Sequence, residues 1–230
     1  MRFKSLFLLS FSLLFASGIL IGKETFFNGK DLAGWSAEDM SYWSVKNEAI
    51  VGTNGDQKVP GNQFLWYDKK VQDFKLTLEV KQLPFTANAG IQFRSIRQTN
   101  GSAVGYQADI GKGWWGALYH EHGRKMLAKN LNTTGKHLKP EEWNQYEILA
   151  VGHRIWLAIN GKITVAVRDP IGEVEGQIAL QVHGGIPQTV IYRNLILERN
   201  PKIELGDMDE QELNKLLTLA PKGFVKPAKK

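Results

Sequence analysis

The sequence predicts an all-β protein, a sandwich or jelly roll of two antiparallel sheets followed by a short C-terminal helix. Short runs in which apolar and polar residues alternate recur along the chain, separated by Gly, Asn, Asp and Pro, as in half-buried strands. Long runs of apolar residues at helical spacing are missing until the C-terminus. With 230 residues, 43% of them hydrophobic, the chain is long enough to bury a core between two sheets.

The alternating runs predict the strands in chain order, at residues 43–51, 64–67, 74–80, 90–94, 106–110, 117–120, 143–151, 154–159, 162–168, 176–183 and 190–198. Asn160 and Gly161 separate two runs and predict a tight hairpin, because both central residues of a type I′ turn need positive φ. Leu213, Leu216 and Leu217 have helical spacing and predict one short helix between Asp207 and Leu219. We therefore expect one β-sandwich domain over residues 23–200, then a short helix and a basic tail over 201–230.

Residues 1–22 have the order of a secretory signal peptide. Arg2 and Lys4 precede an apolar stretch, and Ala16, Ser17 and Gly18 supply small residues at cleavage spacing. We expect cleavage after Gly18 and export of the mature chain. Because the chain has no Cys and needs no oxidative folding, a bacterial periplasm or the extracellular space suits it.

The positive charge is concentrated at the two ends of the chain. The formal net charge is +6, but without residues 1–22 and 221–230 the body has 23 basic and 23 acidic residues. A neutral body lacks the basic surface on which nucleic-acid binding depends. We expect no nucleic-acid partner and, after signal cleavage, no membrane partner.

Period-2 alternation separates a polar face from the core face in several predicted strands. This face is rich in amides and also carries carboxylates, an Arg and a His, whereas solvated strand faces favour Lys, Thr and Glu. Its members are Glu79, Gln92, Arg94, Gln107, Asp109, Gln181 and His183. Two interpretations stay open: an ordinary solvated face, or a polar floor that binds hydroxyl groups.

Aromatic residues favour a carbohydrate ligand. Trp66, Tyr67, Trp114, Trp115 and Tyr119 lie at predicted strand ends or in loops. Sugar rings have apolar C–H faces and polar rims, so aromatic platforms beside amides and carboxylates complement them. Alternation would expose at least one of the adjacent pair Trp114 and Trp115.

Several blocks, in order along the chain, carry a family resemblance. They include residues 27–35 (FNGKDLAGW), 43–48 (WSVKNE), 88–94 (NAGIQFR), 105–110 (GYQADI) and 180–185 (LQVHGG). Together they resemble the 3-keto-disaccharide hydrolase domain family over roughly residues 25–198. The resemblance implies an exported, concanavalin-like jelly-roll sandwich with a ligand groove on its concave sheet. It also implies a substrate, an oligosaccharide or other glycoside, that is oxidised at C3 and whose glycosidic bond is cleaved.

The chemistry of such a substrate explains which groups a site needs. A ketone at C3 acidifies the C2 hydrogen, so a base can remove it, the C1 substituent can leave, and water can add back. This route needs a base, an electrophile near O3 and a proton donor. We expect Arg94 at the oxyanion, either His183 or Asp109 as the base, and the other of these two, or Glu121, as the acid.

The substrate-binding candidates are Glu79, Gln92, Gln107, Trp114, Trp115, Tyr119 and Gln181. Many family members have Glu where this chain has Gln107, and this departure moves the expected carboxylate role to Asp109.

Two further motifs have alternative interpretations. His120 and His122 would share a face of a strand and, with Asp109, could hold a divalent metal; the alternative is a loop with solvated His. Residues 111–116 match G-x-G-x-x-G, but no amphipathic helix follows, so we expect a glycine loop at the groove rim rather than a nucleotide site. No other cofactor is expected.

Two function classes fit the sequence. The first is an exported enzyme that cleaves 3-keto-glycosides, and the second is a non-catalytic, lectin-like carbohydrate-binding module on the same sandwich. Retention of Arg94, Asp109 and His183 favours the enzyme. Gln107 in place of the family's usual Glu favours the module.

Overall fold

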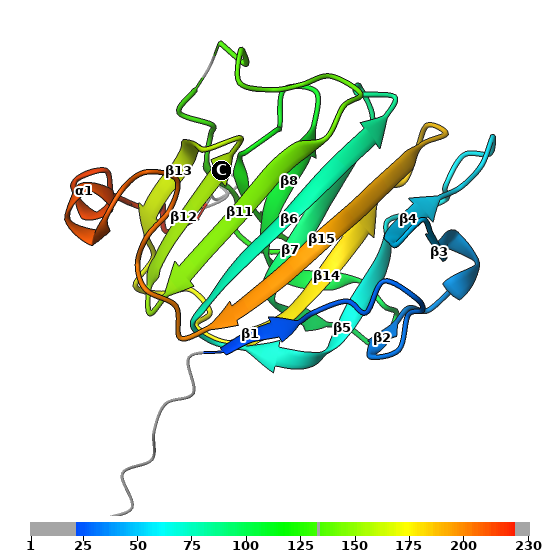
Figure 1. Ribbon diagram of the computed structural model, residues 1–230, viewed down its shortest axis with the longest axis horizontal. Helices are drawn as coiled ribbons and strands as arrows, with labels where there is room; N and C mark the ends of the chain where they lie inside the picture. The colour runs from blue at the N-terminus through cyan, green and yellow to red at the C-terminus, as the bar shows by residue number, and fades with distance from the viewer. Residues whose placement is uncertain (1–21, 133, 224–230) are drawn as a thin grey trace, which may run out of the picture.

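A computed structural model describes residues 22–132 and 134–223, which form two β-sheets packed against each other (Figure 1). The predicted signal peptide, apart from Gly22, and most of the basic tail lie outside the described residues. No helix in the described part of the chain is long and apolar enough to span a membrane.

The first sheet, sheet A, has its strands in the order β16 (Thr218–Leu219), β13 (Lys162–Arg168), β12 (Arg154–Ile159), β11 (Asn144–Val151), β6 (Phe74–Leu83), β15 (Thr189–Arg199), β4 (Ala49–Thr53) and β3 (Trp43–Lys46), with β1 (Gly22–Thr25) beside β15. The second sheet, sheet B, has the order β10 (Lys125–Ala128), β9 (Leu118–Glu121), β8 (Ala103–Gly111), β7 (Asn88–Arg97), β14 (Gly176–Val182), β5 (Gln63–Val71) and β2 (Trp35–Ser36). The pairs are antiparallel except β13 with β16.

The core lies between the sheets and follows the predicted alternation. Leu76 and Ile148 of sheet A share one buried cluster with Ile91, Tyr106 and Leu180 of sheet B. Because alternate residues point to opposite faces of a strand, the polar residues between these positions on β7, β8 and β14 lie on the outer face of sheet B. The predicted all-β, two-sheet fold is confirmed.

Local turns explain where strands begin and end. Asn160 (φ 49°) and Gly161 (φ 73°) form the predicted hairpin between β12 and β13. The single strand expected over residues 43–51 is instead the hairpin β3–β4, because Asn47 (φ 51°) and Glu48 (φ 58°) also have positive φ. Asn-Glu is not a usual signature of such a turn, which is why the sequence did not reveal it.

The C-terminal helix is shorter than predicted. The helix α1 spans Glu210–Lys215, begins at a capping box between Asp209 and Glu212, and buries Leu213. The indole N–H of Trp156 donates to the Leu213 carbonyl at 3.1 Å, which fixes the helix end to sheet A. The chain then turns at Leu216 and pairs as β16 with β13, so Leu219 is in a strand. A 3-10 turn, η1 (Met40–Tyr42), precedes β3.

Candidate active site

Three neighbouring strands of sheet B place four predicted polar residues together. In the pairing register Gln92 of β7 is opposite Gln107 of β8, and Gly90 of β7 lies between Gln181 of β14 and Asp109 of β8. These four side chains are at most 3% exposed. A Cβ at Gly90 would lie 2.6 Å from the Gln107 amide carbon, so only glycine allows Gln107 to lie over this strand.

Hydrogen bonds join these amides to the carboxylate in one chain. The Ser95 hydroxyl donates to Gln92 Oε1 at 2.9 Å, and Gln92 Nε2 donates to Gln107 Oε1 at 2.5 Å. Gln107 Nε2 then donates to Asp109 Oδ1 at 2.6 Å. Because each amide accepts on its oxygen and donates from its nitrogen, the chain orients Gln107 with its N–H toward Asp109. We call this chain the amide relay.

Asp109 is a buried carboxyl group of which only one oxygen accepts a hydrogen bond from the described residues. Its Oδ2 has no hydrogen-bond partner among the described residues. Burial raises the pKa of Asp109 to about 7, the Gln107 hydrogen bond opposes this rise, and the negative charge of Glu121 adds to it. Asp109 therefore exists in both protonation states near neutral pH, as an acid–base or proton-donating group requires.

Asp109 lines a cavity of about 230 Å³, which we call the acid–base cavity. Its walls are Asn88, Gln107, Asp109, Trp114, Tyr119, Glu121 and His183. Six of these residues are sequence-predicted site residues. Carboxyl, imidazole, amide and aromatic groups thus face one space of limited size.

His183 presents a proton acceptor to this cavity. It follows β14 directly, and its Nδ1 lies 2.6 Å from the Gly184 carbonyl oxygen. A carbonyl oxygen can only accept, so Nδ1 carries the hydrogen and Nε2 of the neutral ring carries the lone pair. Nε2 makes no hydrogen bond within the described residues.

Glu121 ends β9 and is the second carboxyl group of the cavity. Burial raises the pKa of Glu121, and the positive charges that His122 and His183 carry when protonated partly oppose the rise. A raised pKa favours the protonated form of Glu121, which is the form a proton donor requires.

The glycine loop after β8 positions the aromatic wall. The loop forms two backbone hydrogen bonds with Asp109. The amide of Gly116 donates to the Asp109 carbonyl at 3.0 Å, and the Asp109 amide donates to the Ala117 carbonyl at 3.0 Å. Trp114 is 41% exposed and meets Tyr119 edge-to-face with ring centroids 6.2 Å apart. The expectation that at least one of the adjacent Trp residues is exposed is confirmed.

Arg94 does not lie in the acid–base cavity, so its predicted place at an oxyanion is corrected. A bulge disturbs the pairing of β7 between Phe93 and Ile96, and Arg94 has φ 46°. Alternation therefore fails at this residue. Its fully buried guanidinium donates to the carbonyls of Gln72 (2.9 Å) and Gly152 (2.6 Å) and to Asp73 Oδ1 (3.1 Å). Arg94 ties sheet B to turns at one end of sheet A.

Four predicted binding residues do not line the acid–base cavity: Gln92 and Gln181, which are fully buried, and Glu79 and Trp115. Glu79 is on β6 of the other sheet, where its carboxylate accepts from Arg193 and Asn194. Trp115 is 3% exposed and stacks on Phe85 with ring centroids 5.4 Å apart. Among the other aromatic candidates, Trp66 and Tyr67 are buried.

The two His residues proposed as a metal pair do not share a face. His120 lies on the inner side beside Tyr106, with Nε2 3.0 Å from Glu173. His122 follows the end of β9, has φ 49°, and has a side chain that is 58% exposed. Within residues 22–132 and 134–223, no group of three or more His, Asp or Glu side chains is arranged to hold a metal.

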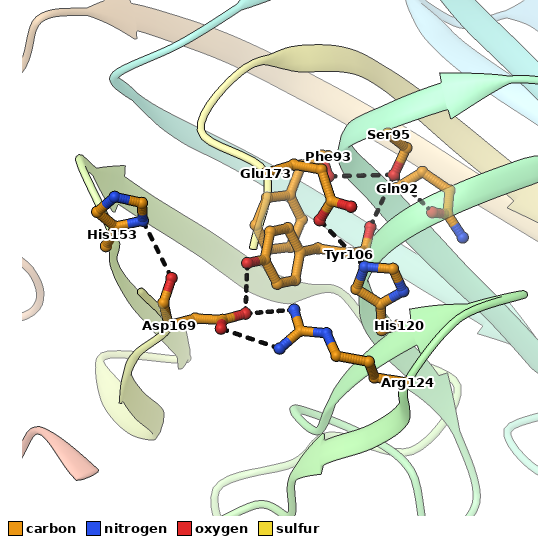
Figure 2. Close-up of polar contacts among 9 residues, drawn as sticks. All are labelled: Gln92, Phe93, Ser95, Tyr106, His120, Arg124, His153, Asp169 and Glu173. Carbon is orange, nitrogen blue, oxygen red and sulfur yellow. Dashed lines mark hydrogen bonds and ion pairs between the residues drawn. The ribbon is translucent and has the colours of Figure 1, made fainter. Parts of the chain in front are cut away.

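Figure 2 shows His120 in a structural cluster instead. The Tyr106 hydroxyl donates to Asp169 at 2.5 Å, and Arg124 forms a double hydrogen bond with the same carboxylate. Burial raises the pKa of Asp169, but hydrogen bonds from Arg124 and Tyr106 outweigh it and lower the pKa. The cluster joins β8 and the β9–β10 turn to the segment after β13.

The structure adds two residues that sequence reasoning missed. Asn88 lines the acid–base cavity, and its Oδ1 is buried without a hydrogen-bond partner in the described chain. Ser95 begins the amide relay. Asn88 stands in the block at residues 88–94 and could have been selected as polar at a strand start, whereas Ser95 lies in the bulge, where alternation gives no guide.

Solved structures share this fold. One is a protein from Parabacteroides distasonis ATCC 8503 assigned to the glycosyl hydrolases, which is 18% identical, with a TM-score of 0.59 over 78% of this chain and 95% of that one. Another is the carbohydrate-binding module CBM66 from Bacillus subtilis, 17% identical, with a TM-score of 0.55 over 72% of this chain and 95% of that one. A third is the Bacillus licheniformis β-glucanase, 11% identical, with a TM-score of 0.50 over 79% and 98%. No curated protein sequence matches the chain.

The jelly-roll sandwich and its polar, aromatic-walled cavity define the class as a carbohydrate-active protein. The family follows from the sequence profile that matches residues 22–198. The chain belongs to the 3-keto-alpha-glucoside-1,2-lyase-like domain family.

Proposed function

We propose that the protein is an exported enzyme that cleaves the glycosidic bond of 3-keto-glycosides by elimination through an enolate. One observation carries the proposal: the buried Asp109 has a pKa near 7 and lines the same small cavity as His183, whose Nε2 has no partner among the described residues, and Glu121. Sugar binding alone needs no carboxyl group held so far from its ordinary pKa.

The first step assigns the base and the electrophile. His183 Nε2 takes the proton from C2, and the electron pair of the C2–H bond moves into an enolate whose charge lies on O3. Protonated Asp109 donates a hydrogen bond to O3. A neutral carboxylic acid in an apolar site can stabilise an enolate in this way, so Asp109 takes the role that the sequence suggested for Arg94.

The second step breaks the glycosidic bond. The enolate electrons reform the ketone as the C1–O bond breaks, which leaves a double bond between C1 and C2. Glu121 gives its proton to the departing oxygen. Water then adds at C1 as ionised Glu121 takes its proton and protonated His183 returns a proton to C2, which gives the free 3-keto sugar and restores both groups.

The amide relay supports this assignment. It holds Asp109 Oδ1 as an acceptor for Gln107, so a proton on the carboxyl group resides on Oδ2, the oxygen that has no partner among the described residues. The ordinary mechanism of glycosidases, with two carboxylates on either side of the bond, makes no use of His183.

The test measures C2 deuterium exchange and sugar release on 3-keto-trehalose, 3-keto-lactose and their unoxidised parents. We expect both signals from the keto sugars alone. His183→Ala should abolish exchange, and Asp109→Ala should reduce kcat by about 10²–10³-fold, the usual effect of removing an oxyanion donor. Asp109→Asn keeps a donor and should retain more activity than Asp109→Ala.

Glu79→Gln is the matched control, because it neutralises a carboxylate on the other sheet, and it should act like the wild type. Binding of the keto sugars without exchange or release would overturn the enzyme in favour of a lectin-like module.

A further inference from the structure

A second cavity adjoins the acid–base cavity at Trp114, the residue that lines both. Its volume of about 580 Å³ exceeds the 230 Å³ of the acid–base cavity and falls in the range of small-molecule sites. Trp114, Trp115, Ala117, Met126 and Leu138 supply its apolar wall. We call it the apolar cavity.

The polar residues of the apolar cavity are mostly engaged with the backbone. Asn130 Nδ2 donates to the Trp115 carbonyl at 2.8 Å, and Asn132 Nδ2 donates to the Ile163 carbonyl at 2.5 Å. Asn130 Oδ1 accepts from the Asn132 amide at 2.7 Å. These amides hold the loop in place, so the wall offers few partners for the many hydroxyls of a second sugar.

Trp115, only 3% exposed, supports this wall from behind, and Trp114, 41% exposed, supplies its accessible indole surface. Trp115 stacks on Phe85 with an interplanar angle of 17°, and Trp114 is set edge-to-face against Tyr119. The accessible indole of Trp114 favours a planar, apolar ligand, because stacking on a ring that is already oriented requires no ordering of the wall.

One accessible hydrogen-bond donor of the wall has no protein partner in the described chain. The exposed Lys129 makes no salt bridge within residues 22–132 and 134–223, whereas Trp115 Nε1, although unpaired there, is fully buried and does not face the cavity space. No Asp or Glu is among the residues that line this cavity. The wall therefore suits a ligand with an acceptor oxygen or a negative charge.

From these observations we propose that the apolar cavity binds the aglycone of the substrate, and that this aglycone is a planar aryl group with an acceptor oxygen, as in a phenolic glycoside. This inference rests on the proposed function, since the keto sugar occupies the acid–base cavity and its C1 substituent crosses Trp114. It names aryl 3-keto-glycosides as the substrates that the protein prefers over 3-keto-disaccharides.

The test compares methyl 3-keto-α-glucoside with 4-nitrophenyl 3-keto-α-glucoside. Met126→Glu places a charge in the apolar cavity, and Met40→Glu is the matched control, because Met40 is exposed in η1 and lines neither cavity. We expect Met126→Glu to lower kcat/KM at least about tenfold for the aryl substrate and to leave the methyl substrate within about twofold. For each substrate, kcat/KM of the variant is divided by kcat/KM of the wild type, so the different reactivities of the two leaving groups cancel.

Lys129→Ala is a milder surface change that guards against misfolding, and it should lower kcat/KM for the aryl substrate alone, by about threefold. Equal losses on both substrates, or no loss on either, would overturn the aryl cavity while leaving the proposed function intact.

A second readout is independent of catalysis. Binding of 4-nitrophenol, followed by quenching of Trp fluorescence, should be lost in Met126→Glu and retained in Met40→Glu. If neither keto substrate reacts with the wild-type protein, the proposed function fails, but the 4-nitrophenol measurement still tests whether the apolar cavity binds aryl groups. Loss of 4-nitrophenol binding in Met126→Glu supports an aryl site, and an unchanged affinity refutes it.

Discussion

Replacement of Asp109 by Asn should change the pH dependence of stability in a defined direction. The pKa of Asp109 is about 7 in the folded protein, against an ordinary value of 3.8. A raised pKa means that the folded state binds the proton more tightly than the unfolded state does. The stability that this proton contributes is complete below about pH 4 and is lost as the pH rises to about 7.

The magnitude follows from the size of the shift. About three pKa units at about 1.4 kcal/mol each give a loss of about 4 kcal/mol at most, spread over the interval between the two pKa values. Within that interval the free energy of unfolding should fall by about 1.4 kcal/mol per pH unit through this group alone. The amide introduced by Asp109→Asn carries no proton equilibrium, and its oxygen can still accept from Gln107.

The assay is urea unfolding of the wild type and Asp109→Asn at pH 5, 6, 7 and 8. The variant should gain stability relative to the wild type at each step from pH 5 to pH 7, and the difference should then level off. Asp169→Asn is the control, because the pKa of Asp169 is lowered and its contribution is lost only in more acidic solution, so its difference should stay flat. A flat difference for Asp109→Asn would refute the protonated, buried carboxyl group.

Other predictions test separate parts of the site. The activity of the wild type should fall above about pH 7 as Asp109 ionises, and in Asp109→Asn this fall should disappear from the pH–rate profile. Gln92→Leu should allow the Gln107 amide to rotate away from Asp109. Because the Gln107 hydrogen bond lowers the pKa of Asp109, its loss should move the fall in activity to higher pH. If Gln92 serves only in packing, the pH of this fall should not change. Glu121→Gln should slow release of a methyl aglycone by about 10²-fold but spare 4-nitrophenol, which leaves without a proton; equal effects would exclude Glu121 as the acid. Arg94→Met should destabilise the fold by about 3 kcal/mol in urea unfolding, because Gln72, Asp73 and Gly152 all lose their donor.

Alternation along the strands was enough to predict much of the site. It placed Gln92, Gln107, Asp109 and Gln181 on one face, and β7, β8 and β14 are indeed neighbours. It failed for Arg94, because a one-residue irregularity in a strand redirects a side chain. It also failed for Glu79, because alternation identifies the face of a strand but not the sheet to which that strand belongs.

The ends of strands were the hardest places to predict. His120 and His122 would have faced the same way in a continuous strand, but β9 ends at Glu121 and the backbone turns at His122. The same turn leaves Glu121 as the last residue whose side chain the strand directs to the acid–base cavity. Where a strand ends is decided by pairing with neighbours, and this information is not local in the sequence.

The cost of burying Asp109 separates a catalytic site from a binding surface. A sugar-binding face could use the amides of Gln92, Gln107 and Gln181 alone and keep its full stability at neutral pH. The structure instead aligns two of these amides and Ser95 on one oxygen of Asp109 and leaves the other oxygen unpaired among the described residues. An arrangement that lowers stability near pH 7 while holding a proton at one chosen atom is explained by a reaction in which that proton takes part.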